Sequence, residues 1–495
     1  MTDTTAPSRR RTKIVATLGP ATDPPETLQA LIAAGADVLR INFSHAPPAA
    51  QRQRVEAARA AAAAAGREVA ILADLAGPKL RIGEIEGGSV TLVNGQPFVL
   101  DTAPEAAPGN AHGVGVSYAG LVRDVEPGAV LLLDDGLIEL SVKAIAGTRI
   151  ECTVLAGGEL ASRKGLNLKG GGLSLGGIGE RDRDDIHQAA ALGVDYLAVS
   201  FPRSAEDMRV ARRLLRAAGG HAALIAKIER SEAIARLDEI VETSDALLVA
   251  RGDLGVEIGD AELPGLQKRI IHTALDYNRT VITATQMMQS MITSPVPTRA
   301  EVLDVANAVI DGTDAVMLSA ETAVGRHPVK VVEAMCRICL GAERHCAALH
   351  RDSELKVQHG RLDQAIAMAA LHTSRQVPID AIVALTESGS TAQWLSRVGS
   401  ATPIFALSPN LNSRRRMALY RNVFPVDYAP AANTMDEVAS GAVAHLTAAG
   451  YLMPGHRVLI TMGDQLGREG GTNTLRLVQI GGDGRPDPQA ALSYR

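Results

Sequence analysis

The chain has 495 residues, of which 46% are apolar and 21% charged, an ordinary composition for a soluble globular protein. This length exceeds what one hydrophobic core organises, so we expect two to four domains. The formal net charge of −5 leaves no basic footprint, which argues against nucleic acid as the main partner, and no apolar stretch reaches the length of a membrane span.

The N-terminus and the cysteines bear on location. Residues 1–11 contain arginines without a hydrophobic segment behind them, so we expect a flexible N-terminal arm and no secretory signal. Three of the four cysteines, Cys336, Cys339 and Cys346, fall in a segment with a helical pattern. A single CxxC without a second pair is more typical of core packing than of zinc binding. Reduced cysteines and no export signal indicate a cytoplasmic protein.

Short β-type runs recur along the first 350 residues, and amphipathic helical patterns separate most of them. Eight repeats of strand and helix is the number that closes a parallel (β/α)8 or TIM barrel. We expect this barrel over residues 12–81 and 180–352. Its strands are predicted at 13–18, 38–43, 69–74, 194–201, 223–228, 246–250, 280–285 and 314–319, and helices among others at 206–217, 232–243, 263–278 and 298–310.

Two further units interrupt or follow this rhythm. Residues 82–179 are rich in Gly and Val, with turn signals and alternating stretches at 130–133 and 138–142. They predict a small inserted β-barrel that forms a lid over the active face, with 169–179 as its return hinge. Residues 353–495 predict a C-terminal open α/β sheet, mostly parallel, with strands at 381–385, 403–407, 423–426, 457–461 and 474–480.

Polar residues gather at the carboxyl end of nearly every barrel strand, where the catalytic face of a parallel α/β protein lies. Glu229 and Asp253 follow neighbouring strands and can share a hard divalent ion, with the ammonium of Lys227 beside it. This is the equipment for moving a phosphoryl group. The alternative is a pair of surface loops joined by a salt bridge. The remaining strand-end polar residues are Arg40, Asn42, Ser44, Asp74, Thr285, Ser319 and Glu321.

The first strand of the C-terminal unit leads into Thr386-Glu-Ser-Gly-Ser-Thr391 and then directly into a helical pattern. Hydroxyl groups and backbone amides at a helix N-terminus suit a phosphate, although simple N-capping explains the same residues. No GxxxxGK[ST] or GxGxxG motif occurs, so other groups must hold the phosphates of any nucleotide.

Six strand-end motifs resemble those of the pyruvate kinase family, in its order and spacing, over residues 12–483. They are Arg40-Ile-Asn-Phe-Ser-His45, Ala226-Lys-Ile-Glu229, Ala250-Arg-Gly-Asp-Leu-Gly-Val-Glu257, Ala284-Thr-Gln-Met287, Thr298-Arg-Ala-Glu301 and Met317-Leu-Ser-Ala-Glu-Thr322. The resemblance implies phosphoryl transfer from phosphoenolpyruvate to ADP, which gives pyruvate and ATP, with Mg²⁺ or Mn²⁺ as cofactor. It also implies a barrel domain, a lid domain, a C-terminal regulatory domain and a homotetramer.

The resemblance assigns roles to the charged residues of the barrel face. Glu229 and Asp253 are similar to the ligands of the catalytic magnesium, and their oxygens suit a hard cation. Lys227 resembles the lysine that bridges the phosphate and the enolate oxygen, where a fixed ammonium offsets developing negative charge. Arg40 resembles the arginine on the transferred phosphoryl group, a task for which the guanidinium fork is well shaped.

The same resemblance identifies residues around the substrate carboxylate and the nucleotide. The backbone amides of Gly252 and Asp253 would hold the carboxylate, and the Thr285 hydroxyl would reach it and help to relay the proton to the enolate. Taken alone, Thr285 is equally an N-cap or core threonine, and Lys164 a solvated surface charge. The expected nucleotide-side residues are Asn42, His45, Arg81 and Lys164.

One segment, 74–79, departs from the family pattern. Potassium-dependent members carry a threonine and a glutamate where this chain has Leu75 and Lys79, which resembles the potassium-independent branch. Asn42, Ser44 and Asp74 offer oxygens to a monovalent cation, and the Lys79 ammonium can deliver that charge permanently. We therefore expect that K⁺ is not required.

The segment 386–391 is similar to the effector-phosphate loop of the family, and 470–474 falls near that site. The implied effector-binding residues are Thr386, Ser388, Gly389, Ser390 and Thr391, and the implied activator is a sugar phosphate or AMP. Two rival functions stay open. One is another Mg²⁺-dependent phosphoenolpyruvate or pyruvate barrel, a lyase or aldolase, which needs neither the lid nor the C-terminal sheet. The other is a catalytically silent, effector-binding relative.

Overall fold

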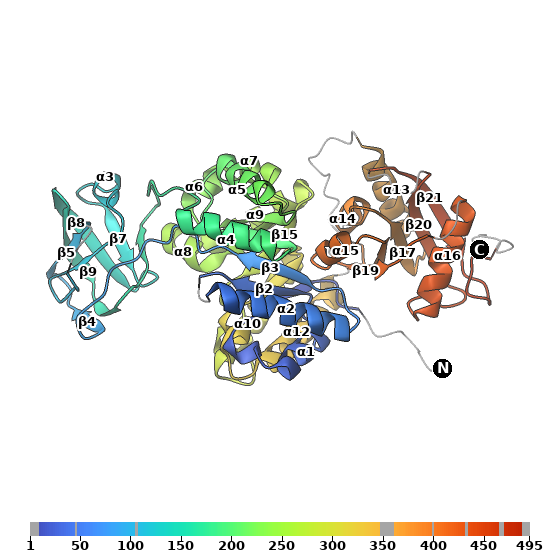
Figure 1. Ribbon diagram of the computed structural model, residues 1–495, viewed down its shortest axis with the longest axis horizontal. Helices are drawn as coiled ribbons and strands as arrows, with labels where there is room; N and C mark the ends of the chain where they lie inside the picture. The colour runs from blue at the N-terminus through green and yellow to red at the C-terminus, as the bar shows by residue number, and fades with distance from the viewer. Residues whose placement is uncertain are drawn as a thin grey trace.

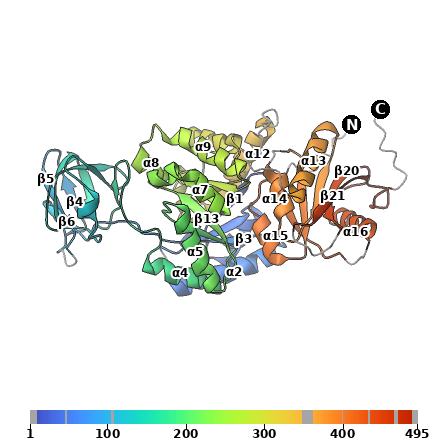
Figure 2. The ribbon, with the colours of Figure 1, turned by 90° about the horizontal axis from the view of Figure 1, so that it is seen from above.

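The computed structural model describes residues 9–44, 47–103, 107–346, 361–397, 400–430, 434–464 and 470–487. Figure 1 shows three bodies in a row, with the barrel between an inserted β domain and a C-terminal α/β domain. The view from above shows the same order (Figure 2). Within the described ranges, no helix combines the length and the apolar character needed to cross a bilayer.

Eight parallel strands form a closed barrel in the order β1-β16-β15-β14-β13-β12-β3-β2, which confirms the predicted fold. The strands are built largely from Ala, Val, Ile and Leu that are almost entirely buried, because helices cover the outside and side chains fill the interior. Their bounds lie within two residues of the predicted ones: β1 (Lys13–Thr17), β2 (Val38–Asn42), β3 (Ala70–Asp74), β12 (Tyr196–Val199), β13 (Ala223–Ile228), β14 (Ala246–Ala250), β15 (Thr280–Ala284) and β16 (Ala315–Leu318).

The helix predicted at 232–243 was wrong in one respect, because the chain forms two helices there. Arg236 leaves the helical conformation with φ −116° and ψ 26°, which separates α6 from α7. The predicted start of the helix at 298–310 agrees with α10, because Thr298 and Glu301 form a reciprocal capping box there. The helices of the barrel unit are α1 (Pro25–Ala33), α2 (Pro48–Ala64), α4 (Glu180–Ala191), α5 (Ala205–Ala217), α6 (Ser231–Ala235), α7 (Leu237–Thr243), α8 (Arg251–Ile258), α9 (Leu263–Asp276), α10 (Arg299–Asp311), α11 (Ala320–Ala323) and α12 (Pro328–Cys346).

The structure also places part of the N-terminal arm and one of the cysteines of the CxxC segment. Of the expected N-terminal arm, the structure describes residues 9–11. The Arg9 guanidinium lies over the Tyr451 ring of the C-terminal domain, 4.7 Å from its centroid, and the next two residues contact the barrel unit. Arg10 pairs with Asp37 at 2.7 Å, and the backbone amide of Arg11 donates to the Glu343 carboxylate at 3.0 Å. Cys339 is fully buried on α12.

The inserted domain lies between β3 and α4. It contains a six-stranded sheet, β11-β7-β8-β9-β5-β6, and a two-stranded sheet, β10-β4, around its own apolar core. Its return segment contacts the barrel through the Gly170 amide, which donates to the Glu257 carbonyl at 3.0 Å. The elements are β4 (Ser89–Leu92), β5 (Pro97–Asp101), β6 (Gly113–Gly115), α3 (Leu121–Asp124), β7 (Val130–Leu133), β8 (Ile138–Ala146), β9 (Arg149–Ala156), β10 (Gly158–Ala161) and β11 (Leu166–Leu168).

The C-terminal domain is an open sheet in the order β19-β18-β17-β20-β21, with only β21 antiparallel to its neighbour. It is docked against the amino-terminal end of the barrel strands. Arg397 pairs there with Asp314 at 2.7 Å, and the Tyr196 hydroxyl donates to the Arg416 carbonyl at 2.7 Å. Its elements are α13 (Leu362–Gln376), β17 (Ala381–Leu385), α14 (Ser390–Arg397), β18 (Ile404–Ser408), α15 (Leu411–Met417), β19 (Val423–Asp427), α16 (Met435–Ala448), β20 (Arg457–Gly463) and β21 (Thr472–Gln479).

Candidate active site

The carboxyl ends of β2, β3 and β13 bring two cations to one buried carboxylate. Asp74 is 1% exposed; its Oδ2 accepts from Arg40 Nε at 2.7 Å, and its Oδ1 lies 3.3 Å from Lys227 Nζ. Burial alone would raise the pKa of Asp74, but Lys227 and Arg40 outweigh it and the pKa is lowered. Asp74 therefore stays ionised and fixes both cations at the mouth of the barrel.

Lys227 is the centre of this cluster. Its ammonium lies 2.9 Å from Glu229 Oε1 and donates to the Ser200 hydroxyl at 2.7 Å. Burial would lower the pKa of Lys227, but the charges of Asp74 and Glu229 outweigh it and the pKa is raised. The group is thus a permanent positive charge at a fixed position.

Glu229 differs from Asp74 because it lacks a second cation. It is 1% exposed and accepts from the Phe201 amide at 2.7 Å. Burial, together with the carboxylates of Asp253 and Asp74, raises the pKa of Glu229 to about 7 against the effect of Lys227. Two carboxylates in a poorly hydrated place leave negative charge that a divalent cation would offset.

The donor set fits such a cation. Asp253 lies in the first turn of α8 and pairs with Lys79 at 2.7 Å. Within the described ranges, no three His, Cys, Asp or Glu side chains form a metal cluster. A cation between Glu229 and Asp253 would take two protein carboxylates and complete its shell with substrate and water, as Mg²⁺ typically does.

Thr285 follows β15 in a strained conformation. Its φ of +66° is unusual for a β-branched residue, and such strain collects at functional sites. Its hydroxyl accepts from the Gly252 amide at 2.9 Å and donates to the Ala284 carbonyl at 2.6 Å. Arg251 stabilises the turn at Thr285, because it donates to the Thr285 carbonyl at 2.7 Å and pairs with Asp304 at 2.6 Å.

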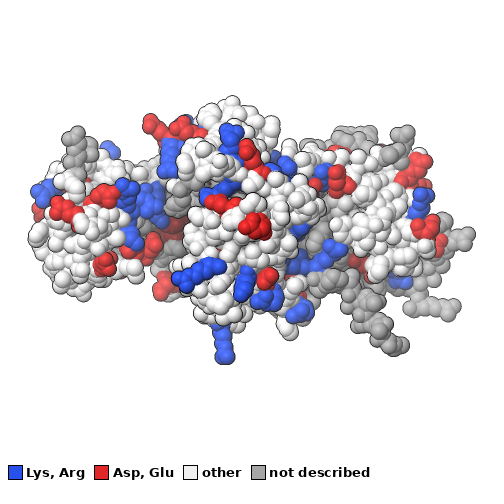
Figure 3. Space-filling model, turned by 60° about the horizontal axis from the view of Figure 1, so that its bottom comes forward, with Lys and Arg blue, Asp and Glu red and all other residues white. Residues whose placement is uncertain are grey.

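Two of the expected nucleotide-side residues, Arg81 and Lys164, contact the inserted domain, whereas Asn42 is the register partner of Asp74 in the barrel. Arg81 donates to the Arg163 carbonyl at 3.0 Å, and Lys164 pairs with Asp134 of the inserted domain at 2.8 Å. Figure 3 shows Lys and Arg side chains grouped where the inserted domain meets the barrel. Asn42 accepts from the Ser44 amide at 2.9 Å at the end of β2. His45 lies outside the described residues.

The Lys79 ammonium was expected beside the oxygens of Asn42, Ser44 and Asp74, in place of a monovalent cation, but its ion pair is with another carboxylate. The ammonium lies on Asp253 rather than on Asp74, whose two oxygens face Arg40 and Lys227. Leu75 is 2% exposed and belongs to the barrel core. Asp74 thus has its countercharge from the chain itself.

Sequence reasoning missed three residues of this face. Thr17 ends β1 and accepts from Arg40 at 3.0 Å, Ser200 follows β12 and contacts Lys227, and Arg251 holds the Thr285 corner. The strand-end rule would have found Thr17 and Ser200, since both follow an apolar run directly. Arg251 stands inside a recognised motif, but nothing in its spacing indicated which carbonyls it contacts.

Four of the five expected effector residues line a small cavity of about 50 Å³ in the C-terminal domain: Thr386, Ser388, Ser390 and Thr391. The Thr386 hydroxyl accepts from the Gly389 amide at 3.0 Å, and Ser390 donates to Asp363 at 3.2 Å. The Thr391 and Thr472 hydroxyls are 2.8 Å apart, which brings 470–472 to the loop as the resemblance implied.

A closed barrel whose strand ends hold a buried lysine, an arginine and two carboxylates defines an α/β-barrel enzyme for an anionic substrate. The sequence matches the family descriptions "Pyruvate kinase, barrel domain" over residues 9–332 and "Pyruvate kinase, alpha/beta domain" over 364–478. The chain belongs to the pyruvate kinase family.

Named relatives agree over nearly the whole length. "Pyruvate kinase II" of Salmonella typhimurium is 50% identical over 95% of this chain and 99% of its own. "Pyruvate kinase" of Haemophilus influenzae is 46% identical over 92% of this chain and 96% of its own. A crystal structure of a pyruvate kinase from Cryptosporidium parvum superposes with a TM-score of 0.86 at 32% identity, covering 95% of this chain and 96% of that one.

Proposed function

We propose that this enzyme transfers a phosphoryl group from phosphoenolpyruvate to ADP, giving pyruvate and ATP, and that it requires Mg²⁺ or Mn²⁺. The observation that carries the proposal is the buried ammonium of Lys227, fixed between Asp74 and Glu229 beside Asp253. The names of the relatives support the same reaction.

Binding follows from the fixed charges. Lys227 and Arg40 offer their positive charge to the phosphoryl group, and the Gly252 amide and the Thr285 hydroxyl suit the substrate carboxylate. Because these groups are already held by Asp74, Ser200 and Arg251, little reorganisation is needed as charge develops.

In the reaction the bond from phosphorus to the enol oxygen breaks and a bond to a terminal ADP oxygen forms. Lys227 stabilises the negative charge on the enol oxygen. The Thr285 hydroxyl, which donates to the Ala284 carbonyl at 2.6 Å, would help to relay the proton that the enolate must receive. Bound at Glu229 and Asp253, Mg²⁺ would supply Lewis-acid stabilisation of the phosphoryl oxygens. Arg81 and Lys164 suit the nucleotide phosphates when the inserted domain approaches the barrel.

A pyruvate-release assay tests this proposal. We expect release only when phosphoenolpyruvate, ADP and Mg²⁺ are all present, with one ATP formed per pyruvate. Release without ADP would favour the lyase or aldolase, and no turnover in any combination would favour the silent relative.

We also propose that K⁺ is dispensable, because Asp74 is neutralised by Arg40 and Lys227 and Asp253 by Lys79. With Mg²⁺ and a bulky inert monovalent salt, we expect added K⁺ to change turnover less than twofold. Lys79→Gln should lower turnover by at least tenfold. Large K⁺ activation of the unaltered enzyme would refute this part of the proposal.

Allosteric activation by a sugar phosphate or AMP at the 386–391 loop, a homotetramer and a cytoplasmic location belong to the same proposal. The hydroxyl groups of the loop support the activation site. The free thiols of Cys152 and Cys339 support the cytoplasmic location. Thr386→Glu places a negative charge where a phosphate would bind. We expect it to abolish activation and to leave the maximal turnover of the unactivated enzyme unchanged; activation that persists would refute the site.

A further inference from the structure

The turn that follows β12 contacts two groups of the candidate active site. The Ser200 hydroxyl accepts from Lys227 Nζ at 2.7 Å, and the Phe201 amide donates to Glu229 Oε2 at 2.7 Å. Ser200 is itself fixed to the barrel, because its hydroxyl donates to the Leu75 carbonyl at 2.8 Å. The position of this turn therefore helps to set where the ammonium and the carboxylate lie.

Phe201 takes part in this turn with an unfavourable backbone conformation. Its φ is +55°, in the left-handed region that bulky side chains avoid, and the residue is buried. Such strain persists only where the surrounding structure over-determines it. Relaxation of this angle would rotate the peptide group that donates to Glu229. The groups that hold the Phe201 ring therefore also hold the Glu229 carboxylate.

Arg230 is one of the groups that hold this ring. Its guanidinium lies over the Phe201 ring, 5.5 Å from the centroid, and its Nη1 donates to the Leu173 carbonyl at 3.4 Å. Leu173 belongs to the return segment of the inserted domain. Gly77 also packs closely against the ring, since a Cβ there would lie 2.9 Å from Phe201 Cδ2. Arg230 and Gly77 together confine the ring.

The charge of Arg230 has no direct partner. The residue is 4% exposed, and its Nε has no hydrogen-bond partner among the described residues. No carboxylate of the described residues lies within ion-pair distance of the guanidinium. Burial of an uncompensated charge costs stability, and local costs of this kind are typical of functional positions. The contact with the Phe201 ring gives such a function.

We propose that Arg230 is a positioning residue for Glu229: it stabilises the left-handed conformation of Phe201 and thereby keeps the Phe201 amide on the carboxylate. This role rests on the proposed function, in which Glu229 and Asp253 bind the divalent cation. The sign of the effect separates positioning from simple electrostatics. Removal of a positive charge by itself favours a nearby cation, whereas loss of positioning weakens its binding.

Mn²⁺ binding to the full-length protein, without substrate or nucleotide, tests the proposal, with free Mn²⁺ measured by electron paramagnetic resonance. Arg230→Met keeps the side-chain stem and removes the guanidinium. Loss of a direct partner of a metal ligand typically weakens metal binding by about 10–100-fold, and Arg230 acts one contact further out. We therefore expect Mn²⁺ to bind at least about fivefold more weakly. Arg230→Lys keeps a cation for the ring and should recover most of the affinity. Phe201→Leu removes the ring and should act like Arg230→Met.

Amide exchange in the metal-free protein measures the turn directly. Because the Phe201 amide is hydrogen-bonded to Glu229, we expect exchange over 199–203 to be at least about threefold faster in Arg230→Met. The kinetic parameters should separate in the same way. The KM for Mg²⁺ should rise, while turnover at saturating Mg²⁺ should fall less than the KM rises.

Arg59→Met is the matched control. Arg59 is a partly buried arginine of the same barrel, which pairs with Asp195 at 2.8 Å and donates to the Val69 carbonyl at 3.2 Å. These contacts lie at the amino-terminal end of the strands, away from Glu229. We expect Arg59→Met to lower the melting temperature and to leave both the Mn²⁺ affinity and the exchange over 199–203 unchanged.

Unchanged or tighter Mn²⁺ binding in Arg230→Met would overturn the proposal, as would unchanged exchange over 199–203. Glu229→Gln separates this result from a failure of the proposed function. Mn²⁺ binding that is lost in Glu229→Gln but kept in Arg230→Met refutes only the role of Arg230. Mn²⁺ binding that survives both substitutions also refutes the metal site at Glu229.

Discussion

At the scale of single residues, two buried carboxylates of the same cluster have opposite pKa shifts. Asp74 faces two cations and its pKa is lowered, whereas burial and the nearby carboxylates raise the pKa of Glu229 to about 7. The difference lies in the number of cations that the chain supplies. Glu229 thus takes a proton in the absence of metal, and a divalent cation competes with that proton.

This gives a pH prediction for the metal-free protein. Because the pKa of Glu229 is raised by folding, its stabilising protonation is present below the unfolded value and is lost as pH rises through about 7. Glu229→Gln removes that loss. We expect its free energy of unfolding, relative to the unaltered protein, to improve by about 2 kcal/mol between pH 5.5 and pH 8.

Urea unfolding in a chelator at the two pH values measures this change. Added Mg²⁺ provides the internal control, because it should stabilise the unaltered protein more at pH 8 than at pH 5.5 and act little on Glu229→Gln. An identical difference between the two proteins at both pH values would contradict the prediction.

Lys227 carries the prediction about catalysis. Lys227→Gln keeps much of the side-chain volume but removes the positive charge that stabilises the enolate oxygen. We therefore expect turnover to fall at least about 10³-fold. Asp74 and Glu229 also lose a shared cation, which should lower the melting temperature. Lys268→Gln is the control, since Lys268 is half-exposed and pairs with Asp311 outside this cluster. A fall in turnover of less than tenfold would exclude this role.

At the scale of elements, the sequence located strands better than helices. The bounds of β13 and β14 were predicted to the residue, because an apolar run ends there at a charged side chain. The break at Arg236 was missed, since the periodicity of 232–243 continues through it without Gly or Pro. The bounds of helix α16 were not predicted, although Thr434 and Glu437 form a capping box that marks its start.

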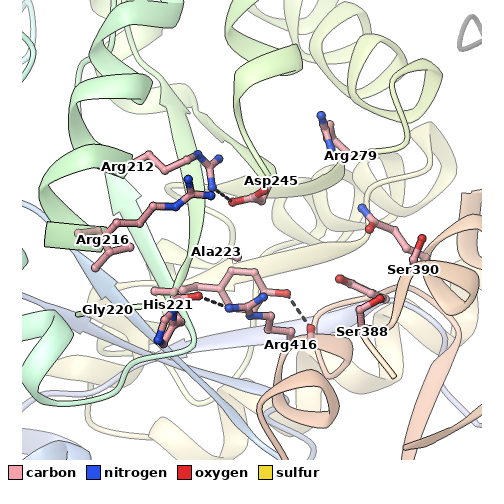
Figure 4. A pocket seen from close by; sticks show the side chains of 15 residues that line it. Arg212, Arg216, Gly220, His221, Ala223, Asp245, Arg279, Ser388, Ser390 and Arg416 are labelled. Carbon is pink, nitrogen blue, oxygen red and sulfur yellow. Dashed lines mark hydrogen bonds and ion pairs between the residues drawn. The ribbon is translucent and has the colours of Figure 1, made fainter. Parts of the chain in front are cut away.

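The residues of the candidate active site could be predicted where they lie at the ends of barrel strands. Lys227 lies near the end of β13, Glu229 follows it, and Asp253 follows the adjacent strand β14, so the strand-end rule brings them together. The cavity of about 390 Å³ between the barrel and the C-terminal domain (Figure 4) has no comparable signal in the sequence. Arg216, Arg279 and Arg416 come from three separate elements, and only the docking of two domains makes them neighbours.

The return segment of the inserted domain supports a prediction about one glycine. Gly171 has φ +82°, and a Cβ there would lie 1.9 Å from the Ser231 hydroxyl oxygen. Gly171→Ala must therefore displace either the segment or the Ser231 hydroxyl, which donates to the Gly170 carbonyl at 3.0 Å, so that contact with α6 is lost in either case. The left-handed conformation adds a backbone cost of about 1–2 kcal/mol. We expect faster amide exchange at 170–172 and 231–232, and an increase of at least threefold in the KM for ADP.

Gly128→Ala is the matched control for the backbone cost. Gly128 lies in the same domain with φ +96°, and no atom lies within 4 Å of its added Cβ. It should destabilise the domain similarly but leave the exchange at 231–232 and the KM for ADP unchanged. If both variants alter the KM equally, the contact with Ser231 is not what positions the inserted domain.

At the scale of the whole molecule, the barrel presents different ends to its two neighbours. The inserted domain leaves from the carboxyl end of β3, beside the cluster of Lys227, and the C-terminal domain covers the amino-terminal ends of the strands. The 386–391 loop and the cluster of Lys227 therefore lie at opposite ends of the barrel. One contact between the barrel and the C-terminal domain is a buried ion pair, Arg397 of α14 with Asp314 just before β16.

Removing this pair tests whether the two bodies unfold as one. Arg397 is 5% exposed and Asp314 is fully buried, so Arg397→Met leaves a carboxylate without its cation in a dry interface. Such a loss costs about 3–5 kcal/mol. We expect thermal unfolding to split into two transitions and the amides of α14 to exchange faster. Arg476→Gln removes an exposed pair with Asp436 in the same domain and should change stability by less than about 0.5 kcal/mol. A single transition in Arg397→Met, with α14 protected as before, would mean that apolar packing alone couples the C-terminal domain to the barrel.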